Sequence, residues 1–320
     1  MSGLADGLYP QAYDPARDAV FAMPLDAEGL RTASFLDDRI LAPGQAGEWR
    51  PAGALESPGG KPLHFIFHTG HVGSTLLSRL IDEAPGVAGL REPLPLRTLA
   101  QMRDARAPLF APRLALFLNL WARGFADTRA VVVKATSTAG RIAPEILQAA
   151  PGAKAVYLNL RAEPYLATLL AGANALVDLK GFEAERRARL TALLGGVPPA
   201  TSIGELAAMT WLAESLTRAL ARDLYGARVL PLDFDAMLAD VPATVAAVLH
   251  HFGIAGDANA IARSPVLTRY SKAPQQFEYS PRFRARLLAQ ARFEHAGEIR
   301  RGLVFLEAIA ARDGRVAALL

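Results

Sequence analysis

The sequence predicts an α/β protein built on an open parallel sheet of about five strands, with helices on both faces and a helical cap. Two observations carry this prediction. Short apolar runs rich in β-branched or aromatic residues recur along the chain, and each is followed by helix-forming sequence. These runs lack clean apolar–polar alternation, which is typical of parallel strands covered on both faces.

Five segments are the candidate strands. The four strongest are LHFIFHT at Leu63–Thr69, AVVVKAT at Ala130–Thr136, AKAVYLNLR at Ala153–Arg161 and ARVLPLDFD at Ala227–Asp235. A weaker fifth is GVAGLREP at Gly86–Pro93. Their separation by helical stretches predicts one sheet with crossover helices.

The first 60 residues differ in composition from the rest. They are rich in Pro, Gly, Asp and Ala, and only the stretch Asp26–Leu41 shows apolar residues at helical spacing. The turn-forming segment Glu56–Pro62 then leads into the first apolar run. We therefore expect an N-terminal extension with one helix over residues 1–60, followed by the α/β domain over 61–320.

A long helical segment, Gly172–Leu224, separates the third and fourth strong strands. It is too long for a crossover of one helix. Helical excursions of this size often cover the ligand-binding edge of a parallel sheet. We therefore interpret residues 172–224 as a cap over the carboxyl ends of the strands.

Composition narrows the possible functions. The 320 residues are 51% hydrophobic, which is typical of a globular chain with a sizeable core. Lys and Arg number 35 against 31 Asp and Glu, and this small surplus suits an anionic small ligand as well as nucleic acid. The chain has no cysteine, which excludes disulfides, thiolate metal sites and cysteine nucleophiles.

The N-terminal sequence lacks the basic and apolar regions of a signal peptide. No apolar stretch approaches the roughly 20 residues that a membrane helix needs. The longest such run, Leu114–Ala122, is closely bracketed by charged residues. We therefore expect a cytoplasmic protein that does not enter a membrane.

The segment His64–Asp82 places an apolar strand, a glycine-containing loop and an amphipathic helix in direct succession. Gly70 and Gly73 can adopt backbone angles that point consecutive N–H groups into one concavity. Ser74 and Thr75 begin the helix and add hydroxyls, while the helix N-terminus contributes partial positive charge. This context favours a phosphate or sulfate site over the simpler alternative, a capped strand-to-helix turn.

The loop is not a Walker A motif. That pattern would need Gly where His68 stands and Lys where Ser74 stands. An ATPase or kinase on this scaffold would lack the lysine that grips the phosphates.

Together with GLREP, at 89–93, the loop resembles the phosphosulfate-binding segment of sulfotransferases that use 3'-phosphoadenosine 5'-phosphosulfate (PAPS). The similarity runs in order and spacing from His64 to Ile254, through AVVVKATS, the Arg161 strand end and VLPLDFDAMLADVPATVAAVLHHFGI. The chain resembles a divergent member of that family, with a P-loop-type fold. The resemblance implies that the co-substrate PAPS, without a metal, contacts Gly70, His71, Val72, Gly73, Ser74, Thr75, Arg161 and Thr168.

Three features depart from the family pattern. His71 stands where most members have Lys or Arg, and Thr168 lies one position short of the usual Arg-to-Ser interval after Arg161. The glycine-rich basic segment near the C-terminus is absent, and Leu267–Pro274 is its only basic substitute.

Sulfuryl transfer needs in-line positioning, positive charge on the transferring group and a base for the acceptor. Lys134, at a strand end, is a candidate to offset charge on the leaving oxygens, or else a solvated strand end. For the base we weigh Glu92 against His71 and His68, since histidine titrates near neutrality.

Arg161 suits bidentate contact with a phosphate. The alternative is a surface ion pair with Glu163 or Asp178.

Several other features have structural interpretations. Asp233 and Asp235 follow a strand and are expected to cap a helix, and no metal site is implied. His250 and His251 are expected at a helix C-terminus, and Trp211 in core or cap packing. The arginine-rich run Pro281–Arg301 predicts an exposed amphipathic helix, because the aromatic residues needed for nucleic-acid stacking are sparse.

The sequence thus predicts a PAPS-dependent sulfotransferase that acts on a hydroxyl or amine of a small-molecule or peptide acceptor, without nucleic-acid or membrane partners. Two alternatives stay open. One is a nucleotide-dependent kinase or NTPase, and the other is an inactive relative that binds an anion or a partner. Neither the acceptor nor the oligomeric state can be read from the chain.

Overall fold

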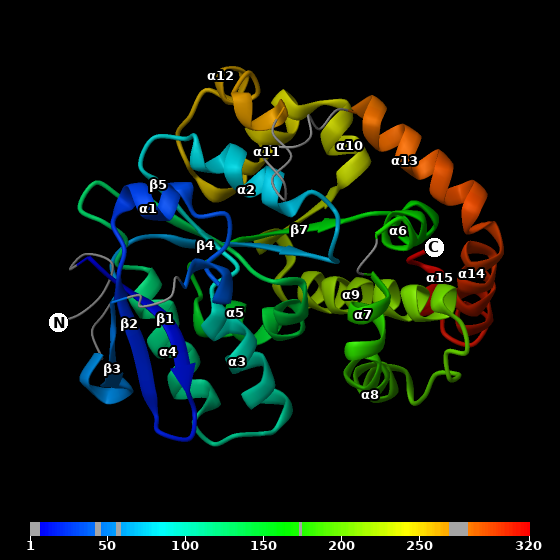
Figure 1. The fold of residues 1–320 in the computed structure, drawn as a ribbon, viewed down its shortest axis with the longest axis horizontal. Coiled ribbons are helices and arrows are strands. Elements are labelled where there is room, and N and C mark those ends of the chain that lie inside the picture. The colour runs from blue at the N-terminus through cyan, green and yellow to red at the C-terminus, as the bar shows by residue number, and fades with distance from the viewer. Residues whose placement is uncertain (1–6, 42–45, 56–58, 173–174, 269–280) are drawn as a thin grey trace.

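The computed structural model describes residues 7–41, 46–55, 59–172, 175–268 and 281–320. Its centre is a sheet with the strand order β5-β6-β4-β7-β8, in which every pair is parallel (Figure 1). The strands are β4 (Leu63–His68), β5 (Val87–Arg91), β6 (Ala130–Lys134), β7 (Ala155–Asn159) and β8 (Val229–Asp233). The predicted fold class, and all five predicted strands, are confirmed.

Burial explains why the strands lack alternation. Every residue of β4 and of β6 is buried, because helices cover both faces of the sheet. Alternate side chains divide the core into two layers. Ile66 packs into one cluster with helices α2 (Ser74–Asp82), α6 (Ala162–Leu170) and α11 (Val241–Phe252), whereas Phe65 and Phe67 pack into the other.

The second layer also contains α3 (Leu94–Asp104), α4 (Phe110–Trp121) and α5 (Ala143–Ala149). Short 3-10 turns, η4 (Ser137–Ile142) and η5 (Gly226–Arg228), precede α5 and β8. The two layers lie on opposite sides of the sheet, with α2 and α11 on one and α3, α4 and α5 on the other (Figure 1).

The N-terminal region holds more structure than the single expected helix. The helix α1 (Ala27–Thr32) is present, but β1 (Leu8–Asp14), β2 (Ala19–Pro24) and β3 (Glu48–Pro51) form an antiparallel sheet that the sequence did not predict. Two 3-10 turns, η2 (Asp38–Ile40) and η3 (Ala52–Leu55), complete it. Buried side chains of β1 and β2 join the same cluster as Phe65 and Phe67. These three strands are short and contain prolines, so they have no clear strand pattern in the sequence. Tertiary packing stabilises them. The boundary at residue 60 stays a prediction.

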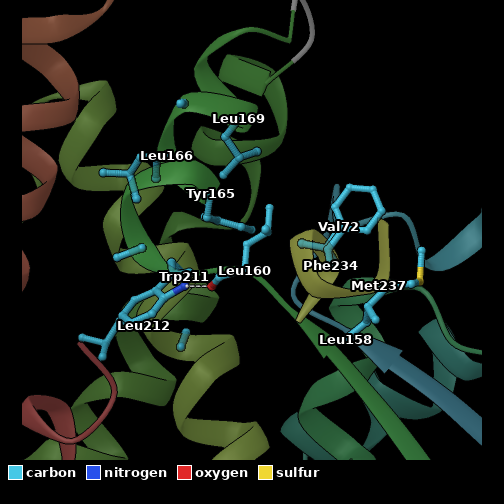
Figure 2. Close-up of a cluster of buried hydrophobic side chains, with 14 of the residues drawn as sticks. Val72, Leu158, Leu160, Tyr165, Leu166, Leu169, Trp211, Leu212, Phe234 and Met237 are labelled. Carbon is cyan, nitrogen blue, oxygen red and sulfur yellow. Dashed lines mark hydrogen bonds between the residues drawn. The ribbon is translucent and has the colours of Figure 1, made fainter. Parts of the chain in front are cut away.

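The expected cap segment divides into parts with different roles. Helices α7 (Ala175–Gly181) and α8 (Glu183–Leu194) contribute Asp178 and Arg186 to a small pocket shared with Gly70. The 23-residue α9 (Ile203–Tyr225) is instead a core helix. Trp211 on α9 is fully buried, and its indole N–H donates to the Leu160 carbonyl at 2.8 Å (Figure 2). The packing expected for Trp211 is confirmed.

The part of the chain after β8 has only helical elements among the described residues. It comprises α10 (Phe234–Ala239), α11, α12 (Ala258–Ile261), η6 (Pro265–Thr268), α13 (Pro281–Glu294), α14 (Ala296–Ala310) and α15 (Gly314–Ala317). The arginine-rich run expected as one helix forms two, α13 and the start of α14.

Helix α14 packs closely on α9, where a Cβ on Gly204 would lie only 1.9 Å from the Glu298 carbonyl oxygen. His250 and His251 occupy the last turn of α11, as predicted. Within the described ranges, no helix combines the length and apolar character needed to span a bilayer.

Candidate functional site

The direction in which successive strands are added to the sheet changes between β4 and β7. From β4 it continues through α2 to β5 on one side, and from β7 it continues to β8 on the other. In open α/β sheets, ligands bind beyond the carboxyl ends of the strands at such a switch point. The predicted loop follows β4 and Arg161 follows β7, so the topology brings the two predicted binding segments to one crevice.

The loop after β4 adopts a series of left-handed conformations. Gly70, His71 and Gly73 have φ angles of 92°, 55° and 70°. Gly73 is the N-cap of α2 and makes no side-chain cap. A Cβ on Gly73 would lie 2.0 Å from Cε2 of Phe234. Both the backbone angle and the space at this position therefore require glycine.

The start of α2 presents backbone donors. The first intrahelical bond runs from the Leu77 N–H to the Gly73 carbonyl at 3.0 Å, so the earlier N–H groups have no acceptor within the helix. The Ser74 and Thr75 side chains lie beside them, 5% and 8% exposed. Val72 points into the core, among the buried side chains drawn in Figure 2, and can offer a ligand only its backbone. This geometry suits an anion.

One loop donor is already used. The Gly70 N–H donates to Nδ1 of His68 at 3.1 Å, and Nε2 of His68 lies 2.9 Å from the Ala135 carbonyl oxygen. Both ring nitrogens of the buried His68 are therefore engaged by the backbone. His68 holds the loop in place, which leaves it poorly suited to the role of base. His71, in contrast, is exposed beside Gly70.

A phenol that the sequence analysis did not select also holds the loop. Tyr165 on α6 is buried, and its hydroxyl donates to the Thr69 carbonyl at 2.7 Å. Burial raises the pKa of Tyr165, so the hydroxyl stays protonated and able to donate. Tyr165 and Thr69 are 96 positions apart in the sequence, so no local sequence pattern predicts their contact.

Two of the predicted catalytic side chains, Glu92 and Lys134, meet. Glu92 follows β5 and Lys134 ends the adjacent β6, where the Glu92 N–H donates to the Lys134 carbonyl at 2.7 Å. The Glu92 carboxylate forms an ion pair with the Lys134 ammonium. Lys134 is 1% exposed, so the alternative of a solvated strand end is wrong. Glu92 has a φ of 57°, a left-handed conformation that a non-glycine residue adopts only when its surroundings enforce it.

Residues of the N-terminal region cover this pair. Arg39 lies 3.2 Å from the second oxygen of Glu92, and its guanidinium stacks 3.6 Å above the centre of the Phe35 ring. The Lys134 ammonium lies 5.6 Å from the same ring. Arg39 also pairs with Asp37 at 2.5 Å. Burial acts to raise the pKa of Asp37, but hydrogen bonds and charge from Arg39 outweigh it and lower the pKa.

Arg161 is exposed at the N-terminus of α6. Its two expected partners pair elsewhere, Glu163 with Arg292 at 2.7 Å and Asp178 with Arg186 at 3.1 Å. Within the described part of the chain, Arg161 forms no ion pair or side-chain hydrogen bond, so the ion-pair alternative is wrong.

Thr168 lies two helical turns beyond Arg161 on α6. Its hydroxyl donates to the Pro164 carbonyl at 2.7 Å, so the proton is not directed outward. The oxygen can still accept a hydrogen bond, but a phosphate needs donors. The basic substitute segment, Leu267–Pro274, lies mostly outside the described residues.

A buried network of charges lies under the loop. Glu214 on α9 is 3% exposed and pairs with Arg189 at 2.5 Å, and Glu185 lies 3.3 Å from Arg189 and 3.8 Å from Arg141. Burial raises the pKa of Glu185, and the two guanidinium groups oppose that shift. This network ties α8, α9 and η4 together beside the pocket that Gly70 lines.

The remaining candidates have structural roles. Asp233 caps α10 by accepting from the Ala236 N–H at 2.9 Å, as predicted. Asp235 does not cap but pairs with Arg284 at 2.5 Å, and that guanidinium lies 4.9 Å above the Phe234 ring. Among the described residues, no group of three or more His, Asp or Glu could hold a metal ion.

Comparison with known proteins gives structural neighbours only. No family model matches the chain, and no curated protein matches it. A sulfotransferase from Alicyclobacillus acidocaldarius aligns at 17% identity over 79% of this chain and 97% of its own, with a TM-score of 0.42. A mouse sulfotransferase in complex with PAP (3',5'-adenosine bisphosphate) aligns at 12% identity over 84% of this chain and 92% of its own, with a TM-score of 0.41. A Mycobacterium avium sulfotransferase aligns at 11% identity over 74% and 77%, with a TM-score of 0.40. A function for this chain must therefore be argued from its own site.

Proposed function

We propose that the chain is a sulfotransferase that moves a sulfuryl group from PAPS to a hydroxyl or amine. One observation carries the proposal. At the switch point of a parallel sheet, α2 begins at a left-handed glycine, presents open backbone donors and has Ser74 where a nucleotide triphosphatase needs lysine. The sequence resemblance to PAPS-dependent enzymes is centred on this loop.

The residues present fit most of the donor molecule. The N–H groups after Gly70 and the Ser74 and Thr75 hydroxyls suit the 5'-phosphosulfate, while the exposed Arg161 suits the 3'-phosphate. Thr168 fits less well, because its hydroxyl proton is donated to Pro164. In this proposal Arg161 is the main contact to the 3'-phosphate.

The transfer breaks the bond between sulfur and the bridging oxygen and forms a bond between sulfur and the acceptor oxygen or nitrogen. The acceptor proton passes to a base, and 3',5'-adenosine bisphosphate leaves. Lys134 would offset charge on the bridging oxygen, and Glu92 or His71 would take the proton. Because Glu92 and Lys134 form an ion pair in this structure, both roles require that pair to separate.

That pair favours one alternative, an anion-binding protein without catalysis. The charge of Lys134 is neutralised by Glu92, and Phe35 and Arg39 cover both groups. If the pair never opens, the loop would still bind an anion, but neither Lys134 nor Glu92 would act on it. We propose a small-molecule or peptide acceptor in the cytoplasm for the active form, without nucleic acid or membrane.

Calorimetric titration with 3',5'-adenosine bisphosphate, 5'-AMP and magnesium-ATP tests the proposal. We expect micromolar binding of the bisphosphate and at least tenfold weaker binding of 5'-AMP, because only the former carries a 3'-phosphate. Tighter binding of magnesium-ATP than of the bisphosphate would refute the proposal and favour a kinase or NTPase. Absence of binding to all three would refute a nucleotide site.

Turnover is tested separately with Glu92→Gln and His71→Gln, by following sulfate transfer from PAPS to a panel of small hydroxyl and amine acceptors. Loss of transfer with retained nucleotide binding would identify the base. If the wild-type protein binds the bisphosphate but transfers no sulfate to any acceptor, the non-catalytic alternative is favoured.

A further inference from the structure

One peptide group of the loop is held at both ends by buried side chains. Thr69 and Gly70 share this group. Its carbonyl oxygen accepts from the Tyr165 hydroxyl at 2.7 Å, and its N–H donates to Nδ1 of His68 at 3.1 Å. Tyr165 is 1% exposed and His68 is 5% exposed, so water competes little for either bond.

These contacts determine the tautomer of His68. Nδ1 accepts a hydrogen bond, so it carries no proton, and Nε2 faces the Ala135 carbonyl at 2.9 Å and must carry one. Through Ala135 the histidine ties the loop to the end of β6, and through Tyr165 the loop is tied to α6. The loop is thus fixed to the elements on both sides of β4.

The glycine makes such a restraint necessary. Gly70 has a φ of 92°, and without a Cβ it could also adopt the negative φ that results when the peptide group flips. A flip would exchange the directions of the Thr69 carbonyl and the Gly70 N–H, so the carbonyl oxygen would face Nδ1 of His68 and both hydrogen bonds would be lost. Without these bonds, the left-handed conformations of Gly70 and His71, which lead into the donors at the start of α2, would no longer be fixed.

We propose that His68 and Tyr165 are positioning residues that prevent this flip and thereby keep the loop in its anion-binding conformation. The proposal rests on the anion site of the proposed function. It assigns no chemical step to either residue, since both act on the ligand only through the backbone.

Substitutions can separate the two bonds of His68. His68→Asn keeps an acceptor near the position of Nδ1 but cannot reach Ala135, whereas His68→Gln places a donor near Nε2 and leaves the Gly70 N–H without a partner. Tyr165→Phe removes only the hydroxyl. Tyr157→Phe is the matched control, because Tyr157 is equally buried and its hydroxyl has no hydrogen-bond partner among the described residues.

Two readouts are needed, the affinity for 3',5'-adenosine bisphosphate and the exchange rate of the Gly70 amide proton measured by NMR. We expect His68→Gln and Tyr165→Phe to weaken binding about tenfold and to speed exchange at Gly70 about tenfold. A tenfold change in either readout is the size expected for the loss of one ordinary buried hydrogen bond. We expect His68→Asn and Tyr157→Phe to stay within about threefold of wild type in both readouts.

Several results would overturn the proposal. If neither His68→Gln nor Tyr165→Phe weakens binding, or if Gly70 exchange is the same in all variants, the loop is not held by these bonds. The melting temperature of each variant shows whether the whole fold has been destabilised. A variant that melts at the wild-type temperature but binds more weakly has lost the loop restraint alone. If the wild-type protein binds no nucleotide, the proposed function fails, and the Gly70 exchange rates alone decide whether His68 and Tyr165 fix the loop.

Discussion

The conformation of Gly73 gives the sharpest test of the loop geometry. Gly73→Ala would force a left-handed backbone on a residue with a Cβ, which costs about 1–2 kcal/mol. The new Cβ would also lie 2.0 Å from Cε2 of Phe234, so the ring must retreat by roughly 1 Å to reach the 3.0 Å that real contacts respect. Overpacking of this kind adds about 1–3 kcal/mol. We therefore expect a loss of about 2–5 kcal/mol in the free energy of unfolding.

The chain offers a matched control for the backbone term. Gly195 caps the C-terminus of α8 with a φ of 75°, and a Cβ there would meet nothing within 4 Å. Gly195→Ala should therefore lose only about 1–2 kcal/mol. Urea denaturation of the two variants isolates the Phe234 contact as the difference. If Gly73→Ala is no less stable than Gly195→Ala, the close packing of Phe234 on the loop is wrong.

Three further predictions concern charge. Arg161→Ala should weaken binding of 3',5'-adenosine bisphosphate at least tenfold without changing binding of 5'-AMP or the melting temperature, because the side chain is exposed; an equal loss for both nucleotides in calorimetry would contradict a 3'-phosphate contact. Lys134→Met should lower the free energy of unfolding by about 3 kcal/mol in urea denaturation, because it removes the buried partner of Glu92 and leaves the half-exposed Arg39 beside it, and the double variant with Glu92→Gln should recover most of that loss. Burial, assisted by charge from Lys154, lowers the pKa of His64 to about 4. The unfolded chain, with the ordinary histidine pKa of 6.5, therefore binds more protons between these values, and stability should fall by at most about 3 kcal/mol as pH drops from 6.5 to 4. Denaturation of His64→Gln across that range should show a flatter dependence, and an unchanged slope would assign it to other groups.

The parts of the fold that could be predicted are those with local causes. The strand β4 is read from a run that is buried at every position, and the loop from glycines at positions that need positive φ. The strands β1–β3 could not be predicted, because they are short and their stability comes from packing against Phe65 and Phe67.

The site divides in the same way. The sequence placed Glu92 and Lys134 at strand ends, which is a local property, but their ion pair joins residues 42 positions apart. The contact of Arg39 with Glu92 spans 53 positions, and it comes from a region expected to be a simple extension. Contacts at such separations depend on how strands are ordered in the sheet, and that order has no signal in one sequence.

The ion pair of Glu92 and Lys134 links the two functions considered for this chain. The backbone N–H groups and hydroxyls of the loop are neutral donors, so side-chain cations are needed to offset the negative charge of a bound phosphosulfate. Arg161 is available for this, but Lys134 is committed to Glu92. A bound anion that draws Lys134 away would release the Glu92 carboxylate from that ion pair, with Arg39 still beside it. In such a site, donor binding itself would free a carboxylate to take the acceptor proton. An anion that leaves the pair intact would bind without consequence, so the fate of this pair on binding distinguishes an enzyme from an anion-binding protein.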